Sequence, residues 1–408
     1  MEYSFSGGEE KKGGAAANAG YASGSDSAGG SDSADAAANA GYAGGAGYAG
    51  GPAAAADYAG GPGDPEYAPD SVKPRDVEHM FIINPKSFQR RSDVDAVLGT
   101  IEGAFKKLDD LEYRVHVSRY PRDAIGAVSG YYQNRSGQKP VRVYAVGGDG
   151  ILFDCLNAVM GHKNAELAIV PYGRENDFVR SFGEGLENLF RDIGAQATSP
   201  SIPTDVMYCD GNYALNFVSI GLESVSLIWR AQLVERFKRL RNVLSSLNNG
   251  VYYLSTALGA LNGGFRNQNY SVLADGERLD GAYTTIHVAN GPCYGKSMTP
   301  TGESVPDDGL LELVIGCARS APDLMRFLPD LCNGRHTSRK NRKKGTFKHR
   351  LIRELEVSSD EPLVMGLDGE VFYDNKMKIR IIPGGVRVVA PNGIRYLQRK
   401  LHQAYSIK

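Results

Sequence analysis

The chain has 408 residues and a formal net charge of −1, so it is long enough for two or three domains. The near-neutral total hides an uneven distribution, because residues 1–72 hold ten acidic residues and two lysines and the rest of the chain is net positive. A basic body favours an anionic partner, such as a nucleotide, a membrane surface or a nucleic acid.

Cysteines and apolar runs exclude several classes of protein. The five cysteines are scattered without a CxxC pair, which argues against structural disulfides or a zinc site and for a reducing compartment. The longest apolar candidate, residues 251–264, is too short for a membrane span and contains glycines. The N-terminus lacks the basic-then-apolar pattern of a signal peptide. We therefore expect a cytoplasmic protein.

Residues 1–75 are low in complexity, with imperfect copies of NAGYA and YAGG. Almost no aliphatic side chain in them is larger than Ala, so they cannot bury a core that offsets the entropy of ordering. We predict a disordered tail, most simply a solubilising leader, although its spaced tyrosines leave self-association open.

Strands and helices alternate over residues 76–200. One apolar strand begins at residue 78 and ends at Asn84-Pro85, and others are predicted at 113–119, 141–146 and 165–173. The helices between them are predicted from the Ser92-Asp93 cap to about Leu108, from Pro121 as first residue, and from about residue 151. This alternation predicts an α/β domain, a parallel sheet with helices on both faces.

The pattern changes after residue 200. Short strands separated by Gly, Asp and Asn turns predict an antiparallel β-sandwich over 201–390. Two helical segments interrupt it, at about 224–262 and 321–332. We expect residues 391–408 to pack back onto the first domain.

A glycine turn around one aspartate, Gly147-Gly148-Asp149-Gly150, links the third predicted strand to a helix. Backbone N–H groups in such a turn suit an anion. A carboxylate fits there if a cation accompanies the anion. By itself the turn is weak evidence, since it also serves as a tight connection between strand and helix.

Three more loops are predicted at the same edge of the sheet. A second glycine turn, at Gly173, is followed by Asn176-Asp177-Phe178, the Asn84–Ser87 loop follows the first strand, and Ser118 ends the second. The carboxyl ends of parallel strands meet at one edge, so the four loops are expected to line one crevice, where ligands of α/β folds bind.

The ordered set NPKS, GGDG, PYGRENDF, DDGLL and LDGE resembles the diacylglycerol kinase catalytic family, in particular its bacterial lipid kinase branch, over about 79–397. The resemblance implies a nucleotide-binding domain at 76–200, a β-sandwich domain for the lipid acceptor, and ATP and Mg²⁺ as cofactors. The nucleotide-binding residues that it implies are Asn84, Pro85, Lys86, Ser87, Ser118, Gly147, Gly148, Asp149, Gly150, Ile151, Asp154, Gly173, Arg174 and Asn176.

The resemblance also implies the catalytic and metal residues. Glu370 in the LDGE turn is the expected base, which takes the proton of a lipid hydroxyl, and Asp149 is expected to face the Mg²⁺ of the triphosphate. A second, structural Mg²⁺ site is implied at the carboxylate of Asp308 and the carbonyls of Val305 and Leu310. Without the other motifs, the Asp-Gly pair of LDGE would indicate only a hairpin.

Three positions depart from the family pattern. Ile151 replaces a usual Thr, so a hydroxyl is lost. Arg174 replaces the Thr of the second turn, where its guanidinium could either bind a phosphate or crowd the pocket. Asp154 replaces a usual Glu and keeps the carboxylate. We expect the active site to be functional, and a weakened or altered nucleotide preference is left open.

Two segments are relevant to membrane association. Residues 334–354 have nine Lys or Arg before their first acid, which favours an anionic membrane surface over nucleic acid, at about 1 kcal/mol for each cation near it. The apolar stripe Trp229, Leu233, Phe237 and Leu240 is typical of core contact more often than of a membrane anchor. We expect peripheral membrane association and no nucleic-acid partner, and a homo-oligomer is left open.

The predicted function is transfer of the γ-phosphate of ATP to a lipid hydroxyl in phospholipid biosynthesis. Diacylglycerol, which gives phosphatidate, is the leading acceptor. Three alternatives remain: a sphingoid-type acceptor, an NAD kinase-like enzyme, and a non-catalytic nucleotide-binding protein that docks on membranes.

Overall fold

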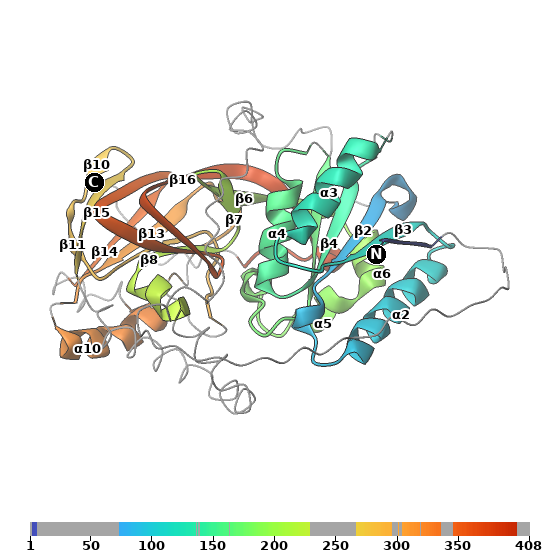
Figure 1. Ribbon diagram of the computed structural model, residues 1–408, viewed down its shortest axis with the longest axis horizontal. Coiled ribbons are helices and arrows are strands. Elements are labelled where there is room, and N and C mark those ends of the chain that lie inside the picture. Colours follow the sequence, from blue (N-terminus) through green and yellow to red (C-terminus); the bar gives the residue numbers. More distant parts are fainter. Residues whose placement is uncertain are drawn as a thin grey trace, which may run out of the picture.

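The computed structural model describes residues 73–135, 137, 139–162, 164–228, 267–295, 301, 304–318, 320–335 and 346–397, together with the backbone of Glu2–Phe5. These residues form two parts that lie side by side along the long axis (Figure 1). Among the described helices, none has the length and hydrophobicity needed to cross a bilayer.

The first part is a parallel sheet in the order β3-β2-β4-β5. Alternate side chains of its strands point to opposite faces. Ile82 and its neighbours pack on α3 and α4, and Phe81 packs on α2. The strands are β2 (Glu78–Ile83), β3 (Tyr113–Val117), β4 (Val141–Gly147) and β5 (Ala165–Pro171), and the helices are α2 (Arg91–Lys107), α3 (Asp123–Asn134), α4 (Asp149–Val159), α5 (Glu187–Arg191) and α6 (Ile193–Thr198). The predicted parallel sheet with helices on both faces is confirmed.

The second part is antiparallel, as predicted, and has its own apolar core. Its strands are β6 (Ser201–Cys209), β7 (Asn212–Ala214), β8 (Phe217–Gly221), β9 (Gln268–Ala274), β10 (Glu277–Arg278), β11 (Gly281–Tyr283), β12 (Thr285–Ala289), β13 (Leu311–Gly316), β14 (Phe347–Ile352) and β15 (Glu354–Leu367). Helix α10 (Ala321–Cys332) begins at the Ser320 cap and buries Leu324, Leu328 and Leu331 against this sheet.

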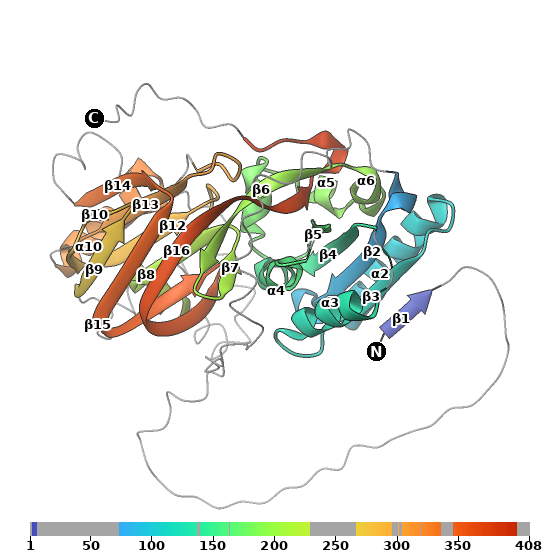
Figure 2. The same ribbon diagram turned by 90° about the horizontal axis from the view of Figure 1, so that it is seen from above.

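Strand β16 (Glu370–Val389) joins the two parts. Near its end, Arg387 and Val388 pair in parallel with β5. Over most of its length, the strand pairs antiparallel with β15 and β6. A register shift lies between Ile382 and Val386. The strands of both parts therefore belong to one continuous sheet (Figure 2).

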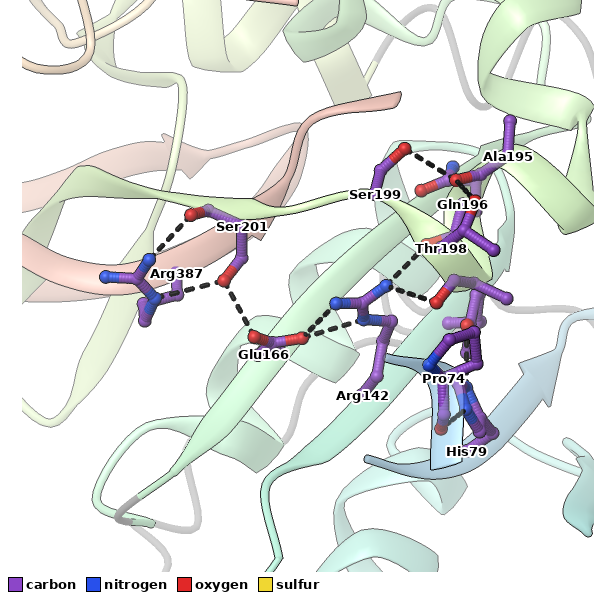
Figure 3. A network of polar contacts seen from close by, with 12 residues as sticks. Pro74, His79, Arg142, Glu166, Ala195, Gln196, Thr198, Ser199, Ser201 and Arg387 are labelled. Carbon is purple, nitrogen blue, oxygen red and sulfur yellow. Dashed lines mark hydrogen bonds and ion pairs between the residues drawn. The ribbon is translucent and has the colours of Figure 1, made fainter. Parts of the chain in front are cut away.

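A buried polar network fixes the end of β16 to the first part (Figure 3). Arg142 of β4 lies 2.7 Å from the carboxylate of Glu166 on β5, and both side chains are fully buried. Ser201 donates to Glu166 and accepts from Arg387 of β16. Because a buried charge without its partner is costly, this network specifies how the strands align.

Short 3₁₀ turns and the C-terminal segment complete the described part of the fold. The turns are η1 (Pro74–Asp76), η2 (Pro85–Ser87), η3 (Asp177–Ser181) and η7 (Pro391–Gly393). Tyr396 packs against Phe182 with ring centroids 4.3 Å apart and shares a 2.7 Å hydrogen bond with Thr204. The chain after η7 therefore returns to the first part, as far as the described residues go.

Two local predictions differ from the structure. Helix α3 begins at Asp123, not at Pro121, because Arg122 has a left-handed backbone with φ of 67°. Within the predicted tail, Glu2–Phe5 forms strand β1, antiparallel to β3. As the outer strand of the parallel sheet, β3 would otherwise present unpaired backbone groups.

Several predicted segments lie outside the described residues. They are the remainder of the tail before residue 73, the stripe at Trp229, Leu233, Phe237 and Leu240, most of the basic run (336–345), and the chain after residue 397.

Candidate functional site

The Asn84–Ser87 loop lies against the GGDG turn. A Cβ added to Gly147 would lie 2.7 Å from Ser87 Oγ and 3.3 Å from Asn84 Cβ. Asn84 accepts the backbone N–H of Lys86 and so caps η2. The structure therefore brings together the ends of β2 and β4, as the motif order predicts.

The two glycine turns touch through their backbones. A Cβ on Gly173 would lie 2.2 Å from Gly148 Cα, and one on Gly148 would lie 3.0 Å from Gly173 Cα. Such distances leave no room for a side chain on Gly173. The ends of β4 and β5 are therefore in direct contact, and glycine is required where they meet.

Asp149 links the two turns. Its carboxylate accepts the backbone N–H of Asn176 at 3.0 Å and that of Asp177 at 2.9 Å. Burial raises the pKa of Asp149, and these hydrogen bonds oppose the rise. Carboxylate oxygens of Asp149, Glu175 and Asp177 lie within 4.8 Å of one another. Hard oxygen donors at this spacing suit Mg²⁺.

Glu370 faces the GGDG turn. A Cβ on Gly150 would lie 3.3 Å from Glu370 Oε1. Burial raises the pKa of Glu370, the Arg122 guanidinium lowers it, and the Asp154 carboxylate raises it. A carboxylate with a raised pKa beside a phosphate-type turn is suited to accept a proton.

Asp368 fixes the turn that carries Glu370. Its carboxylate accepts backbone N–H groups of Leu215, Asn216 and Phe217 at 2.6, 3.0 and 2.8 Å. Burial raises the pKa of Asp368 to about 6, although the three N–H groups oppose the rise. The LDGE segment is thus a hairpin between β15 and β16 whose aspartate is bound to the start of β8.

Arg122 is a site residue that the sequence analysis missed. Its guanidinium makes a 3.2 Å ion pair with Asp154 and lies 4.5 Å from the Phe153 ring centroid. Its charge acts on Glu370. No motif marks Arg122, and its one signal is a backbone conformation that a sequence does not reveal.

The implied structural Mg²⁺ site involves residues 305–310, just before β13. Asp308 is exposed and accepts the backbone N–H of Leu310 at 3.0 Å, and the Val305 side chain is buried in the core of the first part. The sequence analysis missed Asp205, which accepts the N–H groups of Gly309 and Gly384. Burial and two neighbouring aspartates, Asp308 and Asp307, raise the pKa of Asp205 to about 6.

The other implied nucleotide residues lie as follows. Ser118 directly follows β3, and its buried Oγ has no hydrogen-bond partner among the described residues. Ile151 is buried and packs in the core beside Gly147. Arg174 is exposed and does not line the small cavity under the turn, which Gly147, Gly148, Asp149 and Asn176 line with apolar neighbours. Pro85 lies in η2, and the Lys86 side chain is exposed.

Comparison with known proteins identifies the family. Residues 78–209 match the diacylglycerol kinase catalytic domain, and residues 231–390 match the "YegS C-terminal NAD kinase beta sandwich-like domain". The chain contains a diacylglycerol kinase catalytic domain, followed by a β-sandwich domain of the YegS type. These matches support a kinase-type enzyme, and each of the two predicted domains has a matching family model.

Similar proteins align with more than half of this chain. A protein of Staphylococcus aureus strain Mu3, named "Putative lipid kinase", is 26% identical over 254 residues, which are 62% of this chain and 78% of the relative. A Staphylococcus haemolyticus protein of similar name is 26% identical over 249 residues. The crystal structure of a diacylglycerol kinase from Bacillus anthracis strain Sterne has the same fold, with a TM-score of 0.56 at 19% identity over 78% of this chain and 98% of that one.

Proposed function

We propose that the protein is an ATP-dependent lipid kinase that transfers the γ-phosphate to a lipid hydroxyl. The observation that carries this proposal is the position of Glu370, whose carboxylate faces Gly150 of the phosphate-type turn. A base beside the nucleotide phosphates can receive the proton of an attacking alcohol. The names of the relatives support a lipid as the acceptor.

Each loop has a distinct part in the proposed reaction. The backbone N–H groups of the GGDG turn bind the triphosphate, and Asn84, Ser87, Ser118, Gly173 and Asn176 complete the nucleotide pocket. The acceptor hydroxyl loses its proton to Glu370 while its oxygen attacks the γ-phosphorus. The bond between that phosphorus and the leaving oxygen breaks, and the electron pair stays on ADP.

Mg²⁺ is the implied metal, and the residues fit it. Asp149, Glu175 and Asp177 offer hard oxygen donors beside the turn. When bound, Mg²⁺ neutralises charge on the triphosphate. Asp149 keeps the two glycine turns together through its hydrogen bonds to residues 176 and 177, with or without a metal. A structural Mg²⁺ at Asp308 stays part of the proposal.

Diacylglycerol is the proposed acceptor, with phosphatidate as the product. The catalytic-domain match and the name of the similar Bacillus anthracis protein, a diacylglycerol kinase, support diacylglycerol over a sphingoid base or NAD. The cationic side chains of residues 334–354 favour an anionic bilayer as the surface from which the acceptor is taken. We therefore propose a cytoplasmic enzyme that associates peripherally with membranes.

A lipid-panel assay tests the function. The purified chain is incubated with labelled ATP, Mg²⁺ and mixed micelles that contain diacylglycerol or a sphingoid base, with NAD as a soluble alternative. We expect labelled phosphatidate, and we expect Glu370→Gln to reduce its formation by about 10²–10⁴-fold. Label on NAD alone would contradict the proposal. Nucleotide binding without any labelled product would favour a binding protein instead.

A further inference from the structure

Arg122 occupies an unusual place in the backbone. It lies between β3 and α3 and has a φ of 67°, in the left-handed region that residues other than glycine rarely adopt. A backbone of this kind persists where its surroundings over-determine it, and such positions concentrate at functional sites. The contacts of Arg122 should therefore show what holds this backbone and whether the residue belongs to a functional site.

Asp154 attaches Arg122 at two points. The backbone N–H of Arg122 donates to Asp154 Oδ2 at 3.1 Å, and the guanidinium donates to Oδ1 at 3.2 Å. The same guanidinium lies over the Phe153 ring, on the preceding residue of α4. Two residues of α4 therefore set the position of this cation.

The guanidinium lies where the two parts of the molecule meet. It is 5.8 Å from the ring centroid of Phe372 on β16. Phe372 and Glu370 are two residues apart on one strand and so share a face. The Arg122 charge lowers the pKa of Glu370 against the effect of burial. The Arg122 guanidinium, the Glu370 carboxylate and the GGDG turn therefore lie in the same part of the site.

The Arg122 guanidinium has more hydrogen-bond donors than it uses among the described residues. A guanidinium has five N–H groups, and among the described residues its side chain has one hydrogen-bond acceptor, a single oxygen of Asp154. The side chain is 30% exposed. An ion pair that only stabilised the fold would need neither a left-handed backbone nor exposure beside a buried carboxylate. A ligand with several oxygens would use these donors.

We propose that Arg122 is a catalytic residue whose N–H groups bind the phosphoryl group during its transfer, with Asp154 as its positioning residue. This proposal rests on the proposed function. Arg122 changes no bond in the reaction described above, and its part is to stabilise the charge on the phosphoryl oxygens as that group leaves ADP. It supplies hydrogen-bond donors beside α4, the helix in which Ile151 stands where the family pattern has a threonine.

The test uses a mimic of the transferring group, so that it does not depend on the acceptor. ADP binding to the full chain is measured by calorimetry with Mg²⁺, with and without aluminium fluoride. We expect aluminium fluoride to strengthen binding to the wild type by about tenfold or more. Arg122→Gly suits the left-handed backbone, and we expect it to bind ADP normally but to lose the gain.

Turnover supplies a second readout. We expect Arg122→Gly to lower kcat by about 10³-fold, Arg122→Lys to be intermediate because it keeps the charge without the planar fork, and added guanidinium ion to restore part of the activity of Arg122→Gly. Arg119→Gln is the matched control, since Arg119 lies in the same loop, is 62% exposed and pairs with Asp123. We expect this control to behave as the wild type.

The outcomes separate this proposal from the proposed function. A gain from aluminium fluoride that persists in Arg122→Gly overturns the role of Arg122, as does a wild type that shows no gain. If Arg122→Gly still phosphorylates lipid at the wild-type rate, the proposed role of Arg122 is wrong, while the proposed function stands. A gain that depends on Arg122, without phosphorylation of any lipid, supports Arg122 and overturns the lipid acceptor.

Discussion

The carboxylate of Asp368 accepts the backbone N–H of Asn216 at 3.0 Å, with Leu215 and Phe217 bound in the same way. This contact joins the turn before Glu370 to the start of β8. The position of the proposed base is therefore set by a residue two places before it, through a strand about 150 positions earlier in the chain.

Replacing Asp368 by Ala is expected to leave these three N–H groups unpaired. A buried unsatisfied group costs about 1–3 kcal/mol, so unfolding by urea should show a loss of at least that size. We expect kcat to fall while ADP affinity stays within about threefold, because the glycine turns are not bound by Asp368. Unchanged stability and kcat would contradict the proposed role of Asp368. Asp210→Ala, at an exposed hairpin, is a suitable control.

Gly173→Ala is expected to separate the two glycine turns, because the new methyl group would lie 2.2 Å from Gly148 Cα. Overpacking costs about 1–3 kcal/mol, so we expect ADP affinity to fall by about ten- to a hundredfold in a calorimetric titration. Gly126→Ala is the control, since that position in α3 has no atom within 4 Å of an added Cβ. It should bind normally, and an equal loss in both variants would contradict the argument.

The pH dependence of kcat is expected to have an acidic limb. Glu370 must be ionised to accept a proton, so activity falls as the pH drops through its raised pKa. Arg122 lowers this pKa and Asp154 raises it. Arg122→Gly should therefore move the limb to higher pH, and Asp154→Asn should move it to lower pH. Shifts of the same sign, or a limb that persists in Glu370→Gln, would assign the limb to another group.

Arg142→Met is expected to destabilise the fold by about 3–5 kcal/mol, because it leaves the buried Glu166 carboxylate without its ion-pair partner. Urea unfolding measures the loss. Arg75→Met is the control, since Arg75 pairs with Asp109 at the surface and such pairs contribute about 1 kcal/mol or less. The double variant Arg142→Met/Glu166→Met should recover part of the stability. If Arg142→Met and Arg75→Met lose equal free energies of unfolding, the buried ion pair contributes no more to stability than a surface ion pair.

The sequence was sufficient to predict the elements that depend on local patterns. Apolar strands, glycine turns and the helix predicted at 321–332 lie where spacing and residue type place them. The register of Glu370 opposite Gly150 could not be derived from spacing, because it depends on a hairpin more than 200 residues away. It came only from the resemblance between the motif order and a known family.

Arg122 and Asp205 have roles that local sequence patterns do not reveal. Pro121 suggested a helix start, but Asp154 on another helix binds the following residue and delays the helix by two positions. Asp205 lies in an ordinary strand pattern, and only the fold brings Asp307 and Asp308 near it. Residues whose role depends on contacts between distant segments carry no local signal.

Strand β16 has a consequence for biosynthesis. The strand that completes the first sheet beside β5 pairs with it through Arg387 and Val388, so this segment leaves the ribosome more than 200 residues after β5. Until then the outer edge of β5 lacks this neighbour, and unpaired edges favour association with other chains. A nascent or truncated chain without β16 should therefore depend on chaperones, and it would also lack the proposed base.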